Sequence, residues 1–151
     1  KTATKILTDE GAKTIMTIPG DVPLATVAEF ETVLSGHPAA PAMSIVPAQD
    51  GRGSNCILCS PPMAVPLRFG NDSFQPHLAR ARDLGIEPRI VHLPGFALDV
   101  DNPMDLRTLL TYDSETESLA YLSDSGIARR VLPRHNGGPD NSDIVAASRL
   151  V

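Results

Sequence analysis

Residues 14–23, TIMTIPGDVP, form a β-branched apolar run that passes directly into a loop with an aspartate. The run from Thr14 to Ile18 predicts a strand buried on both faces, because it lacks the alternation of apolar and polar residues found in half-exposed strands. Proline and glycine then end the strand and place Asp21 in the loop that follows. An acidic side chain beside a buried strand is the first candidate for a functional residue.

Helical patterns flank this strand on both sides. Upstream, residues 1–13 (KTATKILTDEGAK) are typical of the last turns of a helix, with Gly11 in the place of a C-terminal cap. Because the chain starts with Lys1 rather than methionine, we expect it to begin within the fold. Downstream, Thr26 and Glu29 form the signature of a capping box and predict a helix from Val27 to Leu34.

The rest of the chain alternates short apolar runs with helical patterns. We expect strands at Ala42–Val46, Cys56–Cys59 and Arg89–Leu93, and helices at about Phe74–Leu84, Pro103–Tyr112 and Glu115–Asp124. This alternation predicts an α/β domain in three layers, one sheet covered by helices on both faces, with ligands bound beyond the carboxyl ends of the strands. We assign the domain to residues 1–130 and a flexible tail to residues 131–151.

The composition excludes several classes of protein. A length of 151 residues with 42% hydrophobic content suits one domain with a buried core. With 13 basic and 18 acidic residues, the chain has no electrostatic footprint for a nucleic acid. It contains no membrane span and no signal-peptide pattern, so we expect a cytoplasmic protein. Cys56 and Cys59 point to opposite faces of an expected strand, which favours two buried thiols over a metal or redox site.

Three aspartates, Asp21, Asp99 and Asp101, stand out because each lies within an apolar segment. Two carboxylates about 4 Å apart repel by roughly 4 kcal/mol at an effective dielectric of 20, so a shared site needs a proton or a divalent cation. Mg²⁺ is the natural candidate, since it binds one or two carboxylates and completes its shell with water and phosphate oxygens. The alternative, equally supported by the pattern, is that Asp21 satisfies turn amides and Asp101 caps the helix at Pro103.

The segment Gly70–Ser73 precedes an expected helix and offers backbone N–H groups, a hydroxyl and the positive end of a helix dipole. It could bind a phosphate, although Asp72 or Ser73 could equally serve only as the helix N-cap. The glycine-containing loop 51–54 could also cradle a phosphate, but a hairpin connection is commoner. The four histidines lack the spacing of metal ligands, and we interpret them as surface or packing residues: His37, His77, His92 and His135.

Five segments in succession resemble the 2-phospho-L-lactate guanylyltransferase family: IPGDVPL (18–24), DGRGSN (50–55), PLRFGNDSFQPHL (66–78), LPGFALDVDNPMDL (93–106) and YLSDSGIA (121–128). The resemblance covers about residues 1–130. It implies a nucleotide-diphospho-sugar-transferase-like fold and an enzyme of coenzyme F-420 biosynthesis that joins GTP to a three-carbon phosphoacid and releases pyrophosphate. In different members the acid is 2-phospho-L-lactate, phosphoenolpyruvate or 3-phospho-D-glycerate.

The resemblance also implies roles for single residues. Asp21 of the PGDVP loop and Asp99, the first acid of DVD, would be the catalytic carboxylates and would bind Mg²⁺, with Asp101 as a third candidate metal ligand. The residues that would bind the acceptor's phosphate are Ser54, where the family more often has threonine, and Gly70 and Ser73.

The family begins with a strand and a nucleotide-binding loop that do not precede Lys1. The resemblance therefore implies a domain without its N-terminal strands, a segment that a homo-oligomer or a partner chain could supply. We expect the isolated chain to keep the metal and phosphoacid positions but to transfer GMP inefficiently. Two alternatives stay open: another nucleotidyltransferase of the same fold, such as a cytidylyl or molybdenum-cofactor enzyme, and an inactive fragment or subunit that needs a partner.

Overall fold

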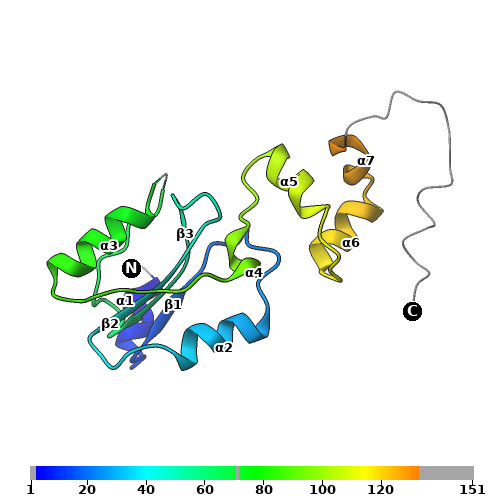
Figure 1. Ribbon diagram of the computed structural model, residues 1–151. Helices are drawn as coiled ribbons and strands as arrows, with labels where there is room; N and C mark the ends of the chain where they lie inside the picture. Colours follow the sequence, from blue (N-terminus) through cyan, green and yellow to red (C-terminus); the bar gives the residue numbers. More distant parts are fainter. Residues whose placement is uncertain (1–2, 71, 133–151) are drawn as a thin grey trace, which may run out of the picture.

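The computed structural model describes residues 3–70 and 72–132, so the predicted tail lies almost wholly outside the described residues. Figure 1 shows the elements in chain order: α1 (Ala3–Asp9), β1 (Ile15–Thr17), α2 (Val27–Ser35), β2 (Ala42–Pro47), β3 (Ser54–Ser60), α3 (Phe74–Asp83), β4 (Arg89–Ile90), α4 (Pro94–Ala97), α5 (Pro103–Leu109), α6 (Glu117–Asp124) and α7 (Ile127–Val131). Within these ranges no helix is both long and apolar enough to cross a membrane.

The four strands form one mixed sheet in the order β1-β3-β2-β4. Strand β3 pairs antiparallel with both β1 and β2, whereas β2 and β4 are parallel. Because β3 runs in the opposite direction, its first residue, Ser54, pairs with the last residue of β2, Pro47. The end of β1, the end of β2 and the start of β3 therefore share one edge of the sheet, where the loops of interest gather.

Helices cover both faces of this sheet, as predicted. On one face, Met43 and Ile57 pack with Phe74 and Leu78 of α3. On the other face, the apolar side chains of β2 and β3 pack with α2 and α4, through Val46, Cys56, Leu58, Val33 and Phe96. Figure 1 shows α3 and α2 on opposite sides of the strands. The three-layer α/β arrangement is confirmed.

The two cysteines follow the same alternation along β3. Cys59 belongs to the core under α3, and Cys56 belongs to the core under α2 and α4. Burial raises the pKa of Cys56 to about 12 and that of Cys59 to about 11. Both are therefore protonated, unreactive thiols at neutral pH, as their strand position predicts.

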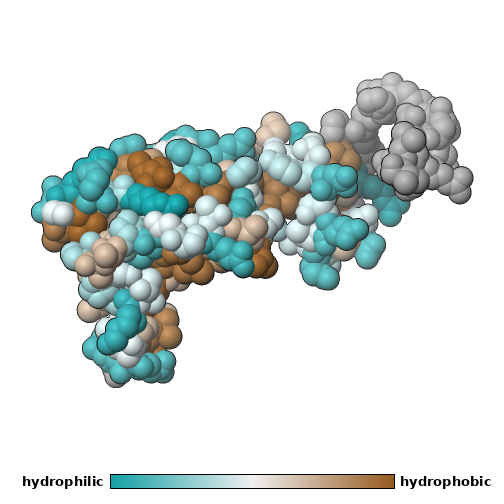
Figure 2. Space-filling view, turned by 60° about the horizontal axis from the view of Figure 1, so that its bottom comes forward, coloured by the Kyte–Doolittle hydropathy of each residue, from teal (hydrophilic) through white to brown (hydrophobic). Residues whose placement is uncertain are grey.

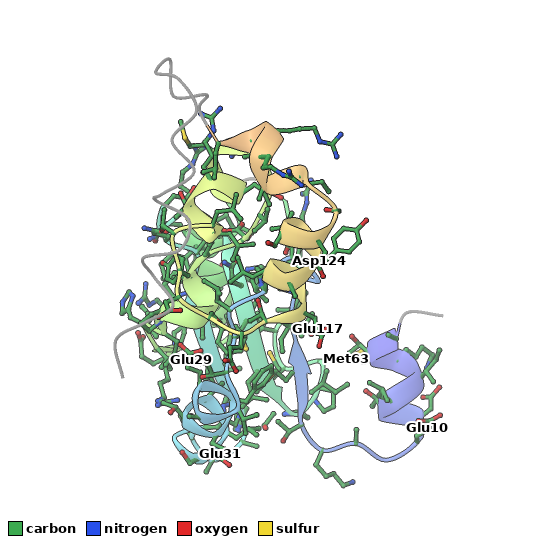
Figure 3. The ribbon with its side chains drawn as sticks, turned by 90° about the vertical axis from the view of Figure 1, so that its right-hand side faces the viewer. Glu10, Glu29, Glu31, Met63, Glu117 and Asp124 are labelled. Atoms are coloured by element: carbon green, nitrogen blue, oxygen red, sulfur yellow. The ribbon has the colours of Figure 1, made fainter. Side chains whose placement is uncertain are left out.

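The chain adds two parts outside this sandwich. Helices α5, α6 and α7 form a lobe that packs on the body through Leu24, Leu98, Leu109 and Leu122. At the other end, α1 has no buried residue, and Figure 3 shows it with Glu10 standing away from the sheet. Figure 2 shows the same helix as a lobe that projects from the elongated body.

Several predicted boundaries were wrong. Strand β1 is half-buried rather than buried on both faces, because it pairs on one side only within the described residues. Strand β4 ends at Ile90 instead of Leu93, since Pro94 starts the short helix α4. Helix α5 stops at Leu109, short of the predicted Tyr112, and α7 was not predicted.

Candidate active site

A cleft of about 390 Å³ opens at the sheet edge where β1 and β2 end and β3 begins. Its lining comes from four loops that are far apart in sequence. All six residues that the sequence predicted for the site line this cleft: Asp21, Ser54, Gly70, Ser73, Asp99 and Asp101. The pairing of distant segments around β3 is what brings them together.

The two aspartate loops are joined directly, since the N–H of Val100 donates to the carbonyl of Asp21 at 3.0 Å. The three carboxylates also interact electrostatically. The pKa of Asp101 is raised above its usual value, first by the charge of Asp99, then by desolvation, and then by Asp21 and Asp105. Carboxylates that repel one another favour a ligand that brings positive charge.

Both alternative roles proposed for these aspartates are contradicted. The Oδ1 atom of Asp21 is buried and has no hydrogen-bond partner among the described residues, so it satisfies no turn amide. Asp101 is not the helix cap, because Asn102 Oδ1 accepts from the N–H of Met104 at 2.8 Å and that of Asp105 at 3.2 Å. A buried carboxylate oxygen without a partner is costly, so this atom needs a water, an ion or another ligand to satisfy it.

Asn55 fixes the position of Asp99 and was missed by the sequence reasoning. Its side chain is buried on β3, where its Nδ2 donates to the carbonyl of Phe96 at 2.8 Å and lies 3.3 Å from Asp99 Oδ1. The amide therefore ties the acidic loop to the sheet. The available signal was an amide side chain directly before the apolar run Cys56–Cys59.

The hydroxyl groups of Ser54 and Ser73, two residues that line the cleft, contact each other. Ser73 Oγ donates to Ser54 Oγ at 3.2 Å, and Ser54 Oγ lies 3.0 Å from His77 Nδ1. Ser73 is the N-cap residue of α3, but its side chain makes no capping bond there, and its hydroxyl is used instead in the contact with Ser54. His77 is buried and hydrogen-bonded, and desolvation lowers its pKa. Its place four residues after Ser73, on the same face of α3, was the overlooked signal.

Residues 48–53 form the hairpin connection between β2 and β3, the commoner of the two roles predicted for the loop 51–54. Asp50 Oδ1 accepts the N–H of Arg52 at 2.8 Å, so this amide is already used inside the turn. The Arg52 carbonyl accepts the N–H of Phe74 at 2.8 Å, and its guanidinium pairs with Asp72. The hairpin therefore holds the loop that precedes α3, where Gly70 adopts a φ of +138°.

The charge of the cleft is strongly acidic. Its lining includes five aspartates and a single arginine: Asp21, Asp50, Asp72, Asp99, Asp101 and Arg52. Within residues 3–70 and 72–132, no three His, Cys, Asp or Glu side chains lie close enough to form a complete metal cluster. The donors present fit Mg²⁺, which takes one or two carboxylates and leaves its other positions to water and phosphate oxygens. The partnerless oxygen of Asp21 supports this fit.

The mixed sheet covered by helices on both faces belongs to the nucleotide-diphospho-sugar-transferase-like class of folds. A crystal structure of a putative nucleotide-diphospho-sugar transferase from Desulfovibrio desulfuricans G20 matches with a TM-score of 0.62 and 21% identity. The match covers 85% of this chain and 58% of that one, and at this identity it shows the fold alone.

The sequence model of the guanylyl transferase CofC-like family matches residues 1–139, and the chain belongs to this family. It is 36% identical to a phosphoenolpyruvate guanylyltransferase of Rubrobacter xylanophilus, over 67% of this chain and 49% of the relative. It is also 36% identical to a 3-phospho-D-glycerate guanylyltransferase of Colwellia psychrerythraea, over 64% and 46%. A 2-phospho-L-lactate guanylyltransferase of Methanothermobacter thermautotrophicus is 31% identical over 72% and 47%. The chain thus spans about half the length of these relatives.

Proposed function

We propose that this chain provides the acceptor and metal side of a guanylyltransferase that joins GTP to a three-carbon phosphoacid in coenzyme F-420 biosynthesis. The acid is of the kind that the relatives' names give: 2-phospho-L-lactate, phosphoenolpyruvate or 3-phospho-D-glycerate. One observation carries the proposal: the acidic loops of Asp21 and Asp99 line the same cleft as Ser54 and Ser73. Because GTP is a cytoplasmic metabolite, we expect the reaction in the cytoplasm.

In the proposed reaction, a phosphate oxygen of the acceptor attacks the α-phosphorus of GTP in line, and pyrophosphate leaves. The Ser54 hydroxyl and the backbone amides near Gly70 and Ser73 would hold the acceptor's phosphate and fix its direction of attack. Asp21 and Asp99, with Asp101 nearby, would hold Mg²⁺, which supplies the positive charge that the acidic cleft lacks. Asn55 would keep Asp99 in place. The protein's contribution is thus positioning and charge rather than covalent chemistry.

Carboxylate substitutions test the metal role. Asp21→Asn and Asp99→Asn should each abolish the binding of Mn²⁺, a stand-in for Mg²⁺, in isothermal calorimetry, because each removes a charged ligand. In a protein that includes the nucleotide-binding half they should also abolish pyrophosphate release from GTP. Asp124→Asn is the matched control, since Asp124 is exposed on α6, outside the cleft (Figure 3). Unchanged Mn²⁺ affinity in both cleft variants would remove them from this role.

The nucleotide-binding half is proposed to come from additional polypeptide, either a partner chain or further sequence of the same protein. The relatives are about twice as long as the aligned region, and β1 pairs on one side only within the described residues. An open strand edge favours pairing with another strand. We therefore expect the isolated chain to release little pyrophosphate from GTP, and robust release would contradict this part of the proposal.

Other nucleotidyltransferases of the same fold remain the competing proposal for the nucleotide. The family match favours GTP, since the relatives are guanylyltransferases. A panel of GTP, CTP and ATP against the three phosphoacids decides the matter in a protein with both halves. Preference for CTP would overturn the guanylyl assignment without changing the metal and phosphate positions.

A further inference from the structure

His77 contacts Ser54, which belongs to the proposed phosphate position, and its two ring nitrogens have different hydrogen-bond partners. The N–H of Arg68 donates to Nε2 at 3.0 Å, and Nδ1 lies 3.0 Å from Ser54 Oγ. A backbone N–H can only donate, so Nε2 must carry its lone pair. In the neutral ring the proton is then on Nδ1, and His77 donates this proton to the Ser54 oxygen.

Ser54 receives a second hydrogen bond from Ser73 Oγ at 3.2 Å. A hydroxyl oxygen has two lone pairs, so these two bonds fill its capacity to accept and leave its own hydrogen to donate. Within the part of the chain that the structure describes, no acceptor is found for this hydrogen. Since Ser54 lines the cleft, the remaining direction for its O–H is toward a ligand there.

We propose that His77 is a positioning residue for the acceptor's phosphate: by donating from Nδ1, it turns the Ser54 hydroxyl hydrogen into the cleft to bind a phosphate oxygen. The inference rests on the proposed function only for the chemical class of the ligand, a small phosphoacid. The arrangement of protons around Ser54 follows from the contacts themselves.

The surroundings of His77 keep its ring neutral. The residue is 2% exposed, and desolvation lowers its pKa. Arg68, Arg80 and Asp72 line the neighbouring cavity of about 510 Å³ with it. Protonation would add a hydrogen at Nε2 and set it against the N–H of Arg68, so the contact with the loop before Gly70 would be lost below the ring's pKa.

The tautomer of His77 tests the first step without any variant or ligand. A long-range ¹H–¹⁵N correlation spectrum of the ¹⁵N-histidine-labelled chain at pH 7.5 should show His77 protonated at Nδ1. Exposed His92 serves as the internal reference, since it is expected to favour the common Nε2–H form. A proton on Nε2 of His77 would overturn the proposal outright.

Binding of inorganic phosphate and of phosphoenolpyruvate, with Mg²⁺ and without GTP, tests the second step. Loss of one hydrogen bond to a charged group should make binding to His77→Leu about tenfold weaker. His77→Asn keeps an N–H donor near the position of Nδ1 and should restore most of the affinity. His37→Leu is the matched control, because His37 also contacts two serines, Ser44 and Ser60, but lies at the far end of β3.

A double-variant cycle separates positioning from simple loss of structure. If His77 acts through Ser54, the His77→Leu/Ser54→Ala variant should bind the probes no more weakly than Ser54→Ala alone. Additive losses, unchanged binding in His77→Leu, or no binding of either probe to the unmodified chain would each overturn the proposal. Normal probe binding without GTP turnover in the complete protein would instead refute the guanylyltransferase assignment and leave this inference standing.

Discussion

At the scale of single residues, the side-chain amide of Asn55 links strand β3 to both Phe96 and Asp99. It donates to the Phe96 carbonyl at 2.8 Å and lies 3.3 Å from the carboxylate of Asp99. Asn55→Ala leaves that buried carbonyl unpaired, so we expect a loss of about 1–3 kcal/mol in the free energy of unfolding. Asn55→Asp should cost more at pH 7 than at pH 4, because a charged carboxylate would face Asp99. Urea unfolding at both pH values measures this, and an aspartate variant as stable as the original would contradict the assigned bonds.

The residue scale also shows what the sequence could not reveal. The pattern of acids in apolar segments identified Asp21 and Asp99, because a carboxylate in such a segment is costly unless a partner or a ligand compensates its charge. The partners that hold these residues, Asn55 and the Val100 N–H, lie on other elements, and their distances depend on the sheet pairing. His77 is buried, which agrees with the predicted packing role, but its contact with Ser54 could not be predicted because it spans 23 residues of sequence.

At the scale of elements, a single glutamate couples two helices. Glu29 accepts the N–H of Thr26 at 3.0 Å, which completes the predicted capping box of α2, and also the N–H of Gly95 in α4 at 2.6 Å. The local part was predictable from the spacing of Thr26 and Glu29, because a capping box involves four consecutive positions. The contact with Gly95 spans 66 residues and follows only from the packing of both helices on one face of the sheet.

This coupling leaves no room for a side chain on Gly95. A Cβ there would collide with the Leu24 carbonyl and the Glu29 carboxylate, and the backbone group cannot move aside cheaply. Gly95→Ala should therefore lower the free energy of unfolding by about 1–3 kcal/mol. Gly20→Ala is the control, since a Cβ at Gly20 meets no atom within 4 Å. Equal urea midpoints for the two alanine variants would show that α4 is free to shift.

At the scale of the whole molecule, repulsion among the aspartates of the cleft lowers the free energy of unfolding when no cation is present. The pKa of Asp101 is raised mainly by Asp99, so its charged form is disfavoured in the folded state. An acid whose pKa is raised in the folded state stabilises the fold at pH values below its pKa in the unfolded chain, 3.8 for an aspartate. This stabilisation is lost as the pH rises through the pKa of the folded state. At pH 7 and low salt, Asp101→Asn should raise the urea midpoint of unfolding. Added Mg²⁺ should reduce the difference in midpoint between this variant and the original protein. Asp124→Asn should leave the midpoint unchanged.

Two histidines that hydrogen-bond to serines, the half-buried His37 and the buried His77, give the stability of the fold a second pH dependence of opposite sign. The pKa of His77 is lowered by desolvation, and that of His37 is lowered by desolvation and then by Arg89. A base with a depressed folded pKa binds its proton first in the unfolded chain, so stability is full above 6.5 and falls as the pH drops toward the folded values. The urea midpoint should therefore decrease from pH 7.5 to pH 5.5. The decrease should be smaller in His37→Leu, which removes one of the two titrations, and an undiminished decrease there would show that His37 titrates normally.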